Sequence, residues 1–317
     1  MAMVEPRLID AYGRIIRKLR LSLTDTCNLR CRYCMPVDAV FMDKQDYLSP
    51  QDYEDIVAEL IDFGLEELRL TGGEPLLRGA FPEIATRLAR LPLRKIGLTT
   101  NGILLDRYLD VLQDCRIQSL NISLDSLELN AFQQMTHGHQ LARVLENIQK
   151  AKERGFQIKI NTVMMRGLND RELLNFVNYS RQLQIEVRFL ELMRIGYACQ
   201  EQTERFISAQ ELIDRLRPWV TLEPVASPLD STSFNFVTPC GARLGFIASE
   251  SQPFCGYCSR WRLSADGIMR ACLLKSEGLS LRGLTAAQRQ ATYQSLLGMK
   301  PYRRPAEVSH AMNRIGG

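Results

Sequence analysis

The chain has 317 residues, of which 45% are hydrophobic and 24% charged, and its formal net charge at pH 7 is +4. This composition is typical of a soluble globular protein with one large α/β domain and an appendage, or with two domains. No apolar run is long enough to span a bilayer, and residues 1–18 lack the apolar segment of a secretory signal. We therefore expect a cytoplasmic protein without a membrane partner.

The predicted elements alternate between strands and helices, which indicates a parallel sheet with helical crossovers. A strand over 19–24 precedes a helix that begins at Ser49-Pro50, a suitable N-cap and first helical residue, and ends at Gly64. Further strands are expected over 67–70, 95–99, 119–124, 157–163 and 185–190, with helices over 81–91, 139–154 and 171–182. Polar or glycine-rich residues recur where these strands end, which favours a partial barrel over an open sheet.

The alternation stops near Tyr197. Beyond it we expect a helix over 208–217, short strands near 234–236 and 245–247, and a last helix over 285–297. We place a boundary between residues 200 and 225, so that residues 1–200 form the barrel and residues 201–317 a C-terminal extension.

Nine cysteines without a secretory signal indicate a reducing compartment, where thiols serve metals or chemistry. Six form two trios, whereas the other three are scattered and are interpreted as small buried hydrophobic residues. The trios are Cys27, Cys31 and Cys34, directly after the first strand, and Cys255, Cys258 and Cys272. Structural zinc normally takes four protein ligands, whereas three thiolates on an iron–sulfur cube leave one iron open. A zinc site completed by Cys240 remains an alternative for the second trio.

Two arginines follow the second trio at alternate positions. Arg260 and Arg262 would project to one side of a short strand, beside the metal site. Such a pair suits an anionic substrate, since guanidinium groups bind phosphates and carboxylates well. The alternative is a solvated basic edge.

The C-x3-C-x2-C loop, with Tyr33 before its last cysteine, resembles the signature of radical S-adenosylmethionine (SAM) enzymes, and Thr71-Gly72-Gly73-Glu74-Pro75 resembles their GGE motif. The second trio, the Arg-x-Arg pair after it and the terminal Gly316-Gly317 narrow this resemblance to the GTP 3′,8-cyclase family of molybdenum cofactor biosynthesis. The resemblance covers about residues 14–317. It implies an incomplete (β/α)6 TIM-type barrel with a C-terminal extension that carries a second Fe–S cluster.

This resemblance also implies site residues. The first trio would hold the SAM cluster, and the second trio would hold a [4Fe–4S] cluster whose open iron takes the guanine base. The residues implied to contact SAM are Tyr33, Gly73, Glu74, Ser123 and Met193. Those implied to bind GTP are Arg20, Arg69, Thr99, Lys159, Arg188, Arg260 and Arg262. Gly316 and Gly317 are expected to enter the active site and assist the radical step.

The implied reaction is radical cyclisation of GTP to 3′,8-cyclo-7,8-dihydro-GTP. The family further implies a small electron donor such as flavodoxin or ferredoxin, and a product passed to cyclic pyranopterin monophosphate synthase. A homodimer is compatible with the resemblance, and no nucleic-acid partner is expected.

Several alternatives stay open at this point. Arg69 and Lys159 could form structural ion pairs, and Met193 could be plain core. A radical SAM enzyme that modifies peptides is the nearest competing enzyme class. A zinc-dependent nucleic-acid-binding protein with surface arginines is the competitor from another class.

Overall fold

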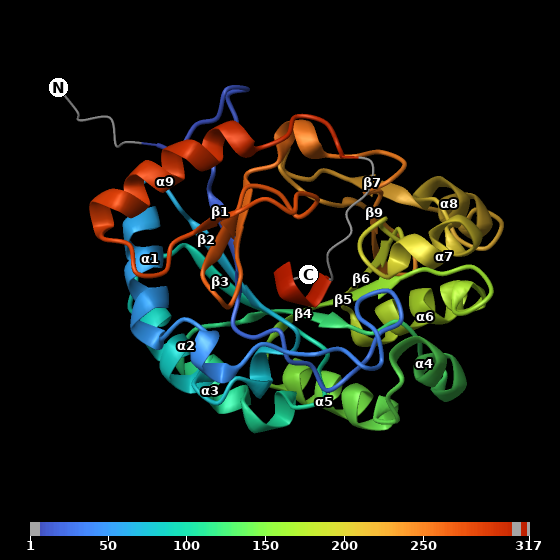
Figure 1. Cartoon of the computed structure of the whole chain (residues 1–317). Helices are drawn as coiled ribbons and strands as arrows, with labels where there is room; N and C mark the ends of the chain where they lie inside the picture. The colour runs from blue at the N-terminus through green and yellow to red at the C-terminus, as the bar shows by residue number, and fades with distance from the viewer. Residues whose placement is uncertain (1–6, 306–311, 316–317) are drawn as a thin grey trace.

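A curved sheet forms the centre of the protein. The structure is a computed structural model, and it describes residues 7–305 and 312–315. Within these residues one 12-stranded sheet has the order β12-β11-β10-β1-β2-β3-β4-β5-β6-β9-β8-β7. Its six central strands pair in parallel and in sequence order. They are β1 (Lys18–Ser22), β2 (Glu67–Thr71), β3 (Lys95–Thr100), β4 (Ser119–Ser123), β5 (Gln157–Val163) and β6 (Glu186–Leu190). The predicted (β/α)6 barrel is confirmed, and Figure 1 shows its strands curving around a common centre.

The segment beyond residue 200 lengthens this sheet at both edges. β9 (Arg243–Ile247) pairs in parallel with β6, and β10 (Arg260–Leu263) pairs in parallel with β1. Outside them lie the antiparallel strands β8 (Phe234–Val237), β7 (Glu223–Val225), β11 (Ile268–Arg270) and β12 (Leu279–Ser280). In the strand order β9 and β10 are not neighbours, so the barrel is incomplete, as predicted. The division into two domains near residue 200 stays a prediction.

Helices cover the outer face of the sheet (Figure 1). Those of the barrel are α1 (Pro50–Asp62), α2 (Phe81–Ala89), α3 (Leu109–Asp114), α4 (Leu129–Thr136), α5 (Leu141–Glu153) and α6 (Leu173–Leu183). They are followed by α7 (Ala198–Arg205), α8 (Ala209–Leu216) and α9 (Ala286–Met299). α1 begins as predicted, because the Ser49 hydroxyl accepts a hydrogen bond from the Asp52 backbone amide and completes a capping box. α9 covers the outer face of β10, where the rings of Trp261 and Tyr293 lie 6.3 Å apart.

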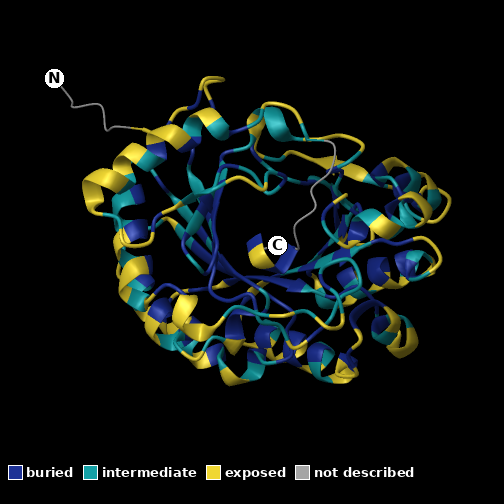
Figure 2. Ribbon diagram, viewed as in Figure 1, coloured by how far each residue is buried: buried dark blue, intermediate teal, exposed yellow. Residues whose placement is uncertain are grey.

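The two faces of the sheet differ in chemistry because side chains alternate along each strand. On β1, Leu19 and Leu21 are buried in the main hydrophobic core, whereas Lys18 and Arg20 lie on the opposite face. Figure 2 shows the same contrast in the helices, whose inner sides are buried and outer sides exposed. The apolar layer between sheet and helices therefore stabilises the fold. The concave face remains free to carry polar side chains.

No helix in the described ranges combines the length and the apolar character needed to cross a membrane. The short helix η6 (Met312–Ile315) lies in the middle of the ring of strands in Figure 1, and its Met312 packs with Ile195 and Leu274.

Candidate active site

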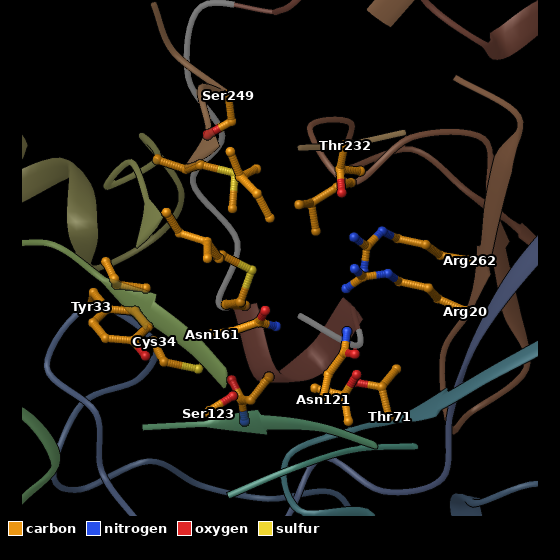
Figure 3. Close-up of a pocket in the computed structure, with 18 of the residues that line it drawn as sticks. Arg20, Tyr33, Cys34, Thr71, Asn121, Ser123, Asn161, Thr232, Ser249 and Arg262 are labelled. Carbon is orange, nitrogen blue, oxygen red and sulfur yellow. The ribbon is translucent and has the colours of Figure 1, made fainter. Parts of the chain in front are cut away.

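The concave face of the sheet encloses a cavity of about 290 Å³. All six cysteines of the two trios line it, together with Arg20, Arg260 and Arg262, which we call the basic group. In Figure 3, Arg20 and Arg262 extend side by side toward the cavity, while Tyr33, Cys34 and Ser123 lie across from them. Residues distant in the sequence are thus brought to one site.

Strand direction places the trios at opposite ends of the barrel. The first trio follows the carboxyl end of β1, whereas Cys255 and Cys258 precede β10, which runs parallel to β1. Cys272 follows β11, which runs antiparallel to β10 and so ends at the same side as Cys258. The two sulfur sets therefore reach the cavity from opposite ends of the barrel and line the same space.

The loop of the first trio is held by the turn after β2. The backbone amides of Gly73 and Glu74 donate to the carbonyl oxygens of Thr24 (2.7 Å) and Thr26 (2.8 Å). A Cβ atom at Gly73 would lie 2.5 Å from the Asp25 carbonyl oxygen, so only glycine allows this approach. The glycines of the predicted GGE motif thus fix the start of the cysteine loop.

Glu74 lies behind the cavity wall and does not line it. Its carboxylate is fully buried and accepts hydrogen bonds from the amides of Leu76 and Asn101 and from the Thr100 hydroxyl. Burial raises the pKa of Glu74 to about 7, although these hydrogen bonds favour the ionised form. Glu74 thus joins the ends of β2 and β3, and its contact to SAM stays a prediction.

Tyr33 and Asp125 connect the first trio to β5. The Tyr33 hydroxyl donates to Asp125 Oδ2 (2.8 Å), and Asp125 Oδ1 accepts from the Val163 amide (2.8 Å). Burial raises the pKa of Asp125 from 3.8 to about 6. Between these values the folded protein keeps a proton that the unfolded chain has lost, so this carboxyl destabilises the fold as the pH rises.

The basic group concentrates positive charge. Arg20 and Arg262 are direct partners in the β1–β10 register. Burial lowers the pKa of Arg20, and the neighbouring charges of Arg262 and Arg260 lower it further. Burial also lowers the pKa of Arg262 to about 10, again with repulsion from Arg260. An anion bound here would relieve this repulsion, which is the arrangement expected at a phosphate site.

Not every arginine and lysine predicted to bind GTP reaches the cavity. Arg188 and Thr99 line it, whereas Arg69 and Lys159 do not. The Arg69 guanidinium donates to the backbone carbonyls of Leu98 (3.2 Å) and Ser119 (3.0 Å). Lys159 forms an ion pair with Glu186 (2.7 Å), which also pairs with Arg188 (2.5 Å). Lys159 thus takes part in an ion pair on the sheet, and its role in GTP binding stays a prediction.

The other predicted residues are placed as follows. Tyr33, Gly73, Ser123 and Met193 line the cavity. Gly316 and Gly317 lie outside the described residues, but Met312 and Asn313 line the cavity just before them. The side-chain amide of Asn313 donates to the backbone carbonyl oxygen of Asp25 (3.1 Å), two residues before the first trio.

Two asparagines of the cavity were missed by the motifs. Asn121 and Asn161 line it from β4 and β5, and their Oδ1 atoms are buried without a hydrogen-bond partner among the described residues, as is Thr99 Oγ1. Because they also line the cavity, these three oxygens are available as hydrogen-bond acceptors for a bound ligand. Strand alternation could have found Asn121, because it lies two residues before the predicted site residue Ser123 on β4 and so on the same face.

The cysteine geometry distinguishes between the metal alternatives. Within the described ranges, no group of three or more His, Cys, Asp and Glu side chains is arranged to hold a single metal ion. A cubane cluster makes a different demand, since its thiolates bind different irons and surround a common space. Both trios line such a space, whereas Cys240, the proposed fourth zinc ligand, is exposed in the turn before β9. The residues present fit two clusters.

The thiols differ in electrostatic environment. Burial raises the pKa of Cys27 to about 11 and that of Cys34 to about 12. Burial would also raise the pKa of Cys258, but Arg260 and Lys300 lower it to about 6. The second trio is thus the more electropositive site.

The fold and the site define a radical SAM enzyme. The sequence profile of the radical SAM superfamily matches residues 21–179, and the profile named Molybdenum Cofactor Synthesis C matches residues 185–309. The crystal structure of Streptococcus suis SuiB bound to S-adenosylmethionine has a similar fold, with a TM-score of 0.62 over 85% of this chain and 64% of that chain, at 14% identity.

Curated relatives identify the family. GTP 3′,8-cyclase of Synechocystis sp. is 58% identical over 98% of this chain and 95% of its own length. GTP 3′,8-cyclase of Aquifex aeolicus is 37% identical over 87% of both chains. Human molybdenum cofactor biosynthesis protein 1 is 40% identical over 87% of this chain and 44% of its own length. The chain belongs to the GTP 3′,8-cyclase family, whose cofactors are [4Fe–4S] clusters and SAM.

Proposed function

We propose that this protein cyclises GTP to 3′,8-cyclo-7,8-dihydro-GTP by radical chemistry, as the first step of molybdenum cofactor biosynthesis. The observation that carries this proposal is that two cysteine trios and a basic group line one cavity. The similarity to GTP 3′,8-cyclases along nearly the whole chain supports it.

In this proposal the first trio holds the cluster that binds SAM, and the second trio holds the other cluster. When bound, the reduced first cluster and SAM supply the radical that removes hydrogen from ribose C3′, and the second cluster supplies an open iron for the guanine base. Tyr33, Gly73, Ser123 and Met193 are proposed to contact SAM, since they line the same cavity as the first trio. Glu74 is proposed to support this contact by fixing the Asn101 backbone amide.

The basic group is proposed to bind the triphosphate. Arg20, Arg260 and Arg262 project from two paired strands, so their guanidinium groups are held in register before the nucleotide arrives. Preorganised cations in a buried site bind phosphate strongly and fix the orientation of the ribose. The side-chain oxygens of Thr99 and Asn121, which have no partner in the part of the chain that the structure describes, are proposed to accept hydrogen bonds from the bound ligands.

The cavity is also suited to protecting a radical from water. Most of its lining is apolar, with Leu190, Ile247 and Met312 among the contributors, and the sheet encloses it. Exclusion of water limits side reactions of a reactive intermediate. Gly316 and Gly317 are proposed to enter this space, because Met312 and Asn313 already line it.

The test of the basic group compares Arg260→Ala and Arg262→Ala with Arg217→Ala, whose side chain is 67% exposed on the surface. Anaerobic assays with SAM, a reductant and GTP should measure 5′-deoxyadenosine and cyclised product separately. We expect both cavity variants to keep SAM cleavage and to lose at least ten-fold in GTP turnover, whereas the control keeps both. Unchanged GTP turnover in both cavity variants would remove the role assigned to the basic group.

The partners of the reaction are further proposals that rest on the family. The electron is proposed to come from a small donor such as flavodoxin or ferredoxin, and the product to pass to cyclic pyranopterin monophosphate synthase. A homodimer is proposed on the same basis, and sedimentation of the holoenzyme would test it.

A further inference from the structure

A buried lysine lies directly behind the second trio. Lys300, at the end of α9, is only 3% exposed, and its ammonium donates to Cys258 Sγ (3.4 Å). The same ammonium donates to the backbone carbonyls of Arg260 (2.7 Å) and Ala271 (3.0 Å). Burying an ammonium is costly unless its donors are used, and here all three find acceptors. Each acceptor belongs to a segment that carries or adjoins a cysteine of the trio.

A buried arginine completes the arrangement from the opposite end of the chain. Arg14 Nη1 donates to the carbonyl oxygens of Cys255 (2.7 Å) and Pro301 (2.9 Å), and Nη2 donates to that of Lys300 (3.1 Å). Asp10 holds the Arg14 guanidinium through a buried ion pair (2.7 Å). Arg14 therefore joins the first cysteine of the trio to the residues around Lys300.

Together the two cations contact all three cysteine segments. Arg14 reaches Cys255, and Lys300 reaches Cys258 directly and Cys272 through the preceding residue, Ala271. The first trio has a different environment, because the donors to Cys27 Sγ are the neutral Leu29 amide (3.4 Å) and the Asn101 side chain (3.8 Å). Charged donors to a ligand sulfur are thus a feature of the second trio.

We propose that Lys300, oriented by Arg14, is a positioning residue of the second cluster, which it helps to retain and whose reduced state it stabilises. This inference rests on the two-cluster site of the proposed function. Partners of this kind orient metal ligands and are often needed for full metal affinity. A positive charge and hydrogen bonds at the sulfurs also favour the added electron, because they offset the negative charge of a reduced cluster.

The experiment uses the reconstituted full-length holoenzyme and the variants Lys300→Met, Lys300→Gln and Lys300→Arg. Lys275→Met is the matched control, since Lys275 lies three residues after Cys272 and its loss also removes one positive charge near the trio. The readouts are iron content and the electron paramagnetic resonance signals of the two clusters during a reductive titration. The first-cluster signal serves as an internal reference.

We expect the second cluster of Lys300→Met to be reduced only at a lower potential than that of the wild type. At a fixed potential its ratio of reduced to oxidised cluster should be at least ten-fold lower than in the wild type. This corresponds to about 59 mV for a one-electron couple. Lys300→Gln keeps some N–H donors but no charge, so its second cluster should show the same shift in the reductive titration. Lys300→Arg keeps the charge, so its second cluster should titrate like that of the wild type. Iron should fall toward half in Lys300→Met after exposure to a chelator, with the first cluster retained.

The outcomes separate the two proposals. A wild-type enzyme with a single cluster would overturn the proposed function itself. If both clusters are present and the Lys300 variants titrate and retain iron like Lys275→Met, the positioning role is wrong. Should Lys300→Met fail to fold, the comparison between Lys300→Gln and Lys300→Arg decides, because a purely structural role would not move the second-cluster titration with charge.

Discussion

Replacing Gly73 by alanine should disturb the loop of the first trio more than any other part of the fold. The added Cβ atom would lie 2.5 Å from the Asp25 carbonyl oxygen and closer still to that of Thr26. Both atoms belong to the backbone, so no side-chain rotation relieves the clash. Because ordinary contact begins near 3.4 Å, the segment that leads into Cys27 must move by about 1 Å.

The cost can be estimated from overpacked cores, where one inserted methyl group typically destabilises a protein by about 1–3 kcal/mol. We expect Gly73→Ala to lie near 3 kcal/mol, since two carbonyls oppose the new atom and the hydrogen bonds from Gly73 and Glu74 hold the same loop. A loss of this size should lower the melting temperature by about 4–5 °C in a protein of this length. The displaced loop should also bind iron less well at the first trio.

Gly79→Ala provides the control within the same connection. Gly79 is exposed, a Cβ atom there meets nothing within 4 Å, and its backbone conformation is one that alanine accepts. Such a change should be neutral or slightly stabilising. Urea unfolding of the apoproteins and iron content after reconstitution should be compared. Equal stability and equal iron binding in the two variants would refute the argument that the Gly73 backbone approach sets the cysteine loop.

Two further predictions concern buried polar groups. Asp125→Asn keeps both hydrogen bonds, since its side-chain amide can accept from the Val163 backbone amide and donate to the Tyr33 oxygen. The wild-type protein should lose stability as the pH rises from about 5, until the buried carboxyl loses its proton near pH 6, whereas the variant should not. The free energy of unfolding of the variant relative to that of the wild type should therefore rise by about 1.4 kcal/mol between about pH 5 and pH 7.5. Parallel urea-unfolding results at both pH values would contradict this. Gly97→Ala places a Cβ atom 2.6 Å from Arg69 Cζ and should lower the free energy of unfolding by about 1–3 kcal/mol by displacing the guanidinium from two backbone carbonyls. An unchanged denaturation midpoint would show that Arg69 moves aside without loss.

The barrel could be predicted because its signals are local. Ser49 and Pro50 begin α1 where the capping pattern places them, and the cysteine loop and the Gly72-Gly73 turn follow neighbouring strands as expected. Parallel strands bring their carboxyl ends to one edge, so the first half of the site follows from the order of the elements. α3, α4 and α7 were not predicted; all three are short and follow loops without a strong start signal.

Which charged residues reach the cavity depends on side-chain contacts that no motif records. Arg69 and Arg20 are register partners on neighbouring strands, yet only Arg20 lines the cavity. The difference arises because Gly97 leaves room for the Arg69 guanidinium to lie along the sheet and bond to backbone carbonyls. A glycine on one strand thus decides the direction of a side chain on the next, and this is visible only when the register is known.

The second half of the site needed the tertiary structure for a related reason. β10 places Cys258 at the amino end of the barrel only because it pairs with β1, more than 200 residues earlier in the chain. That same pairing brings Arg14 to the Cys255 carbonyl and to Lys300. A buried cation is stable only when its partners are already in place, so these two residues show no sequence signal of their own. The second trio is therefore held by contacts between the two ends of the chain, and a change at Arg14 should affect the second cluster more than the first.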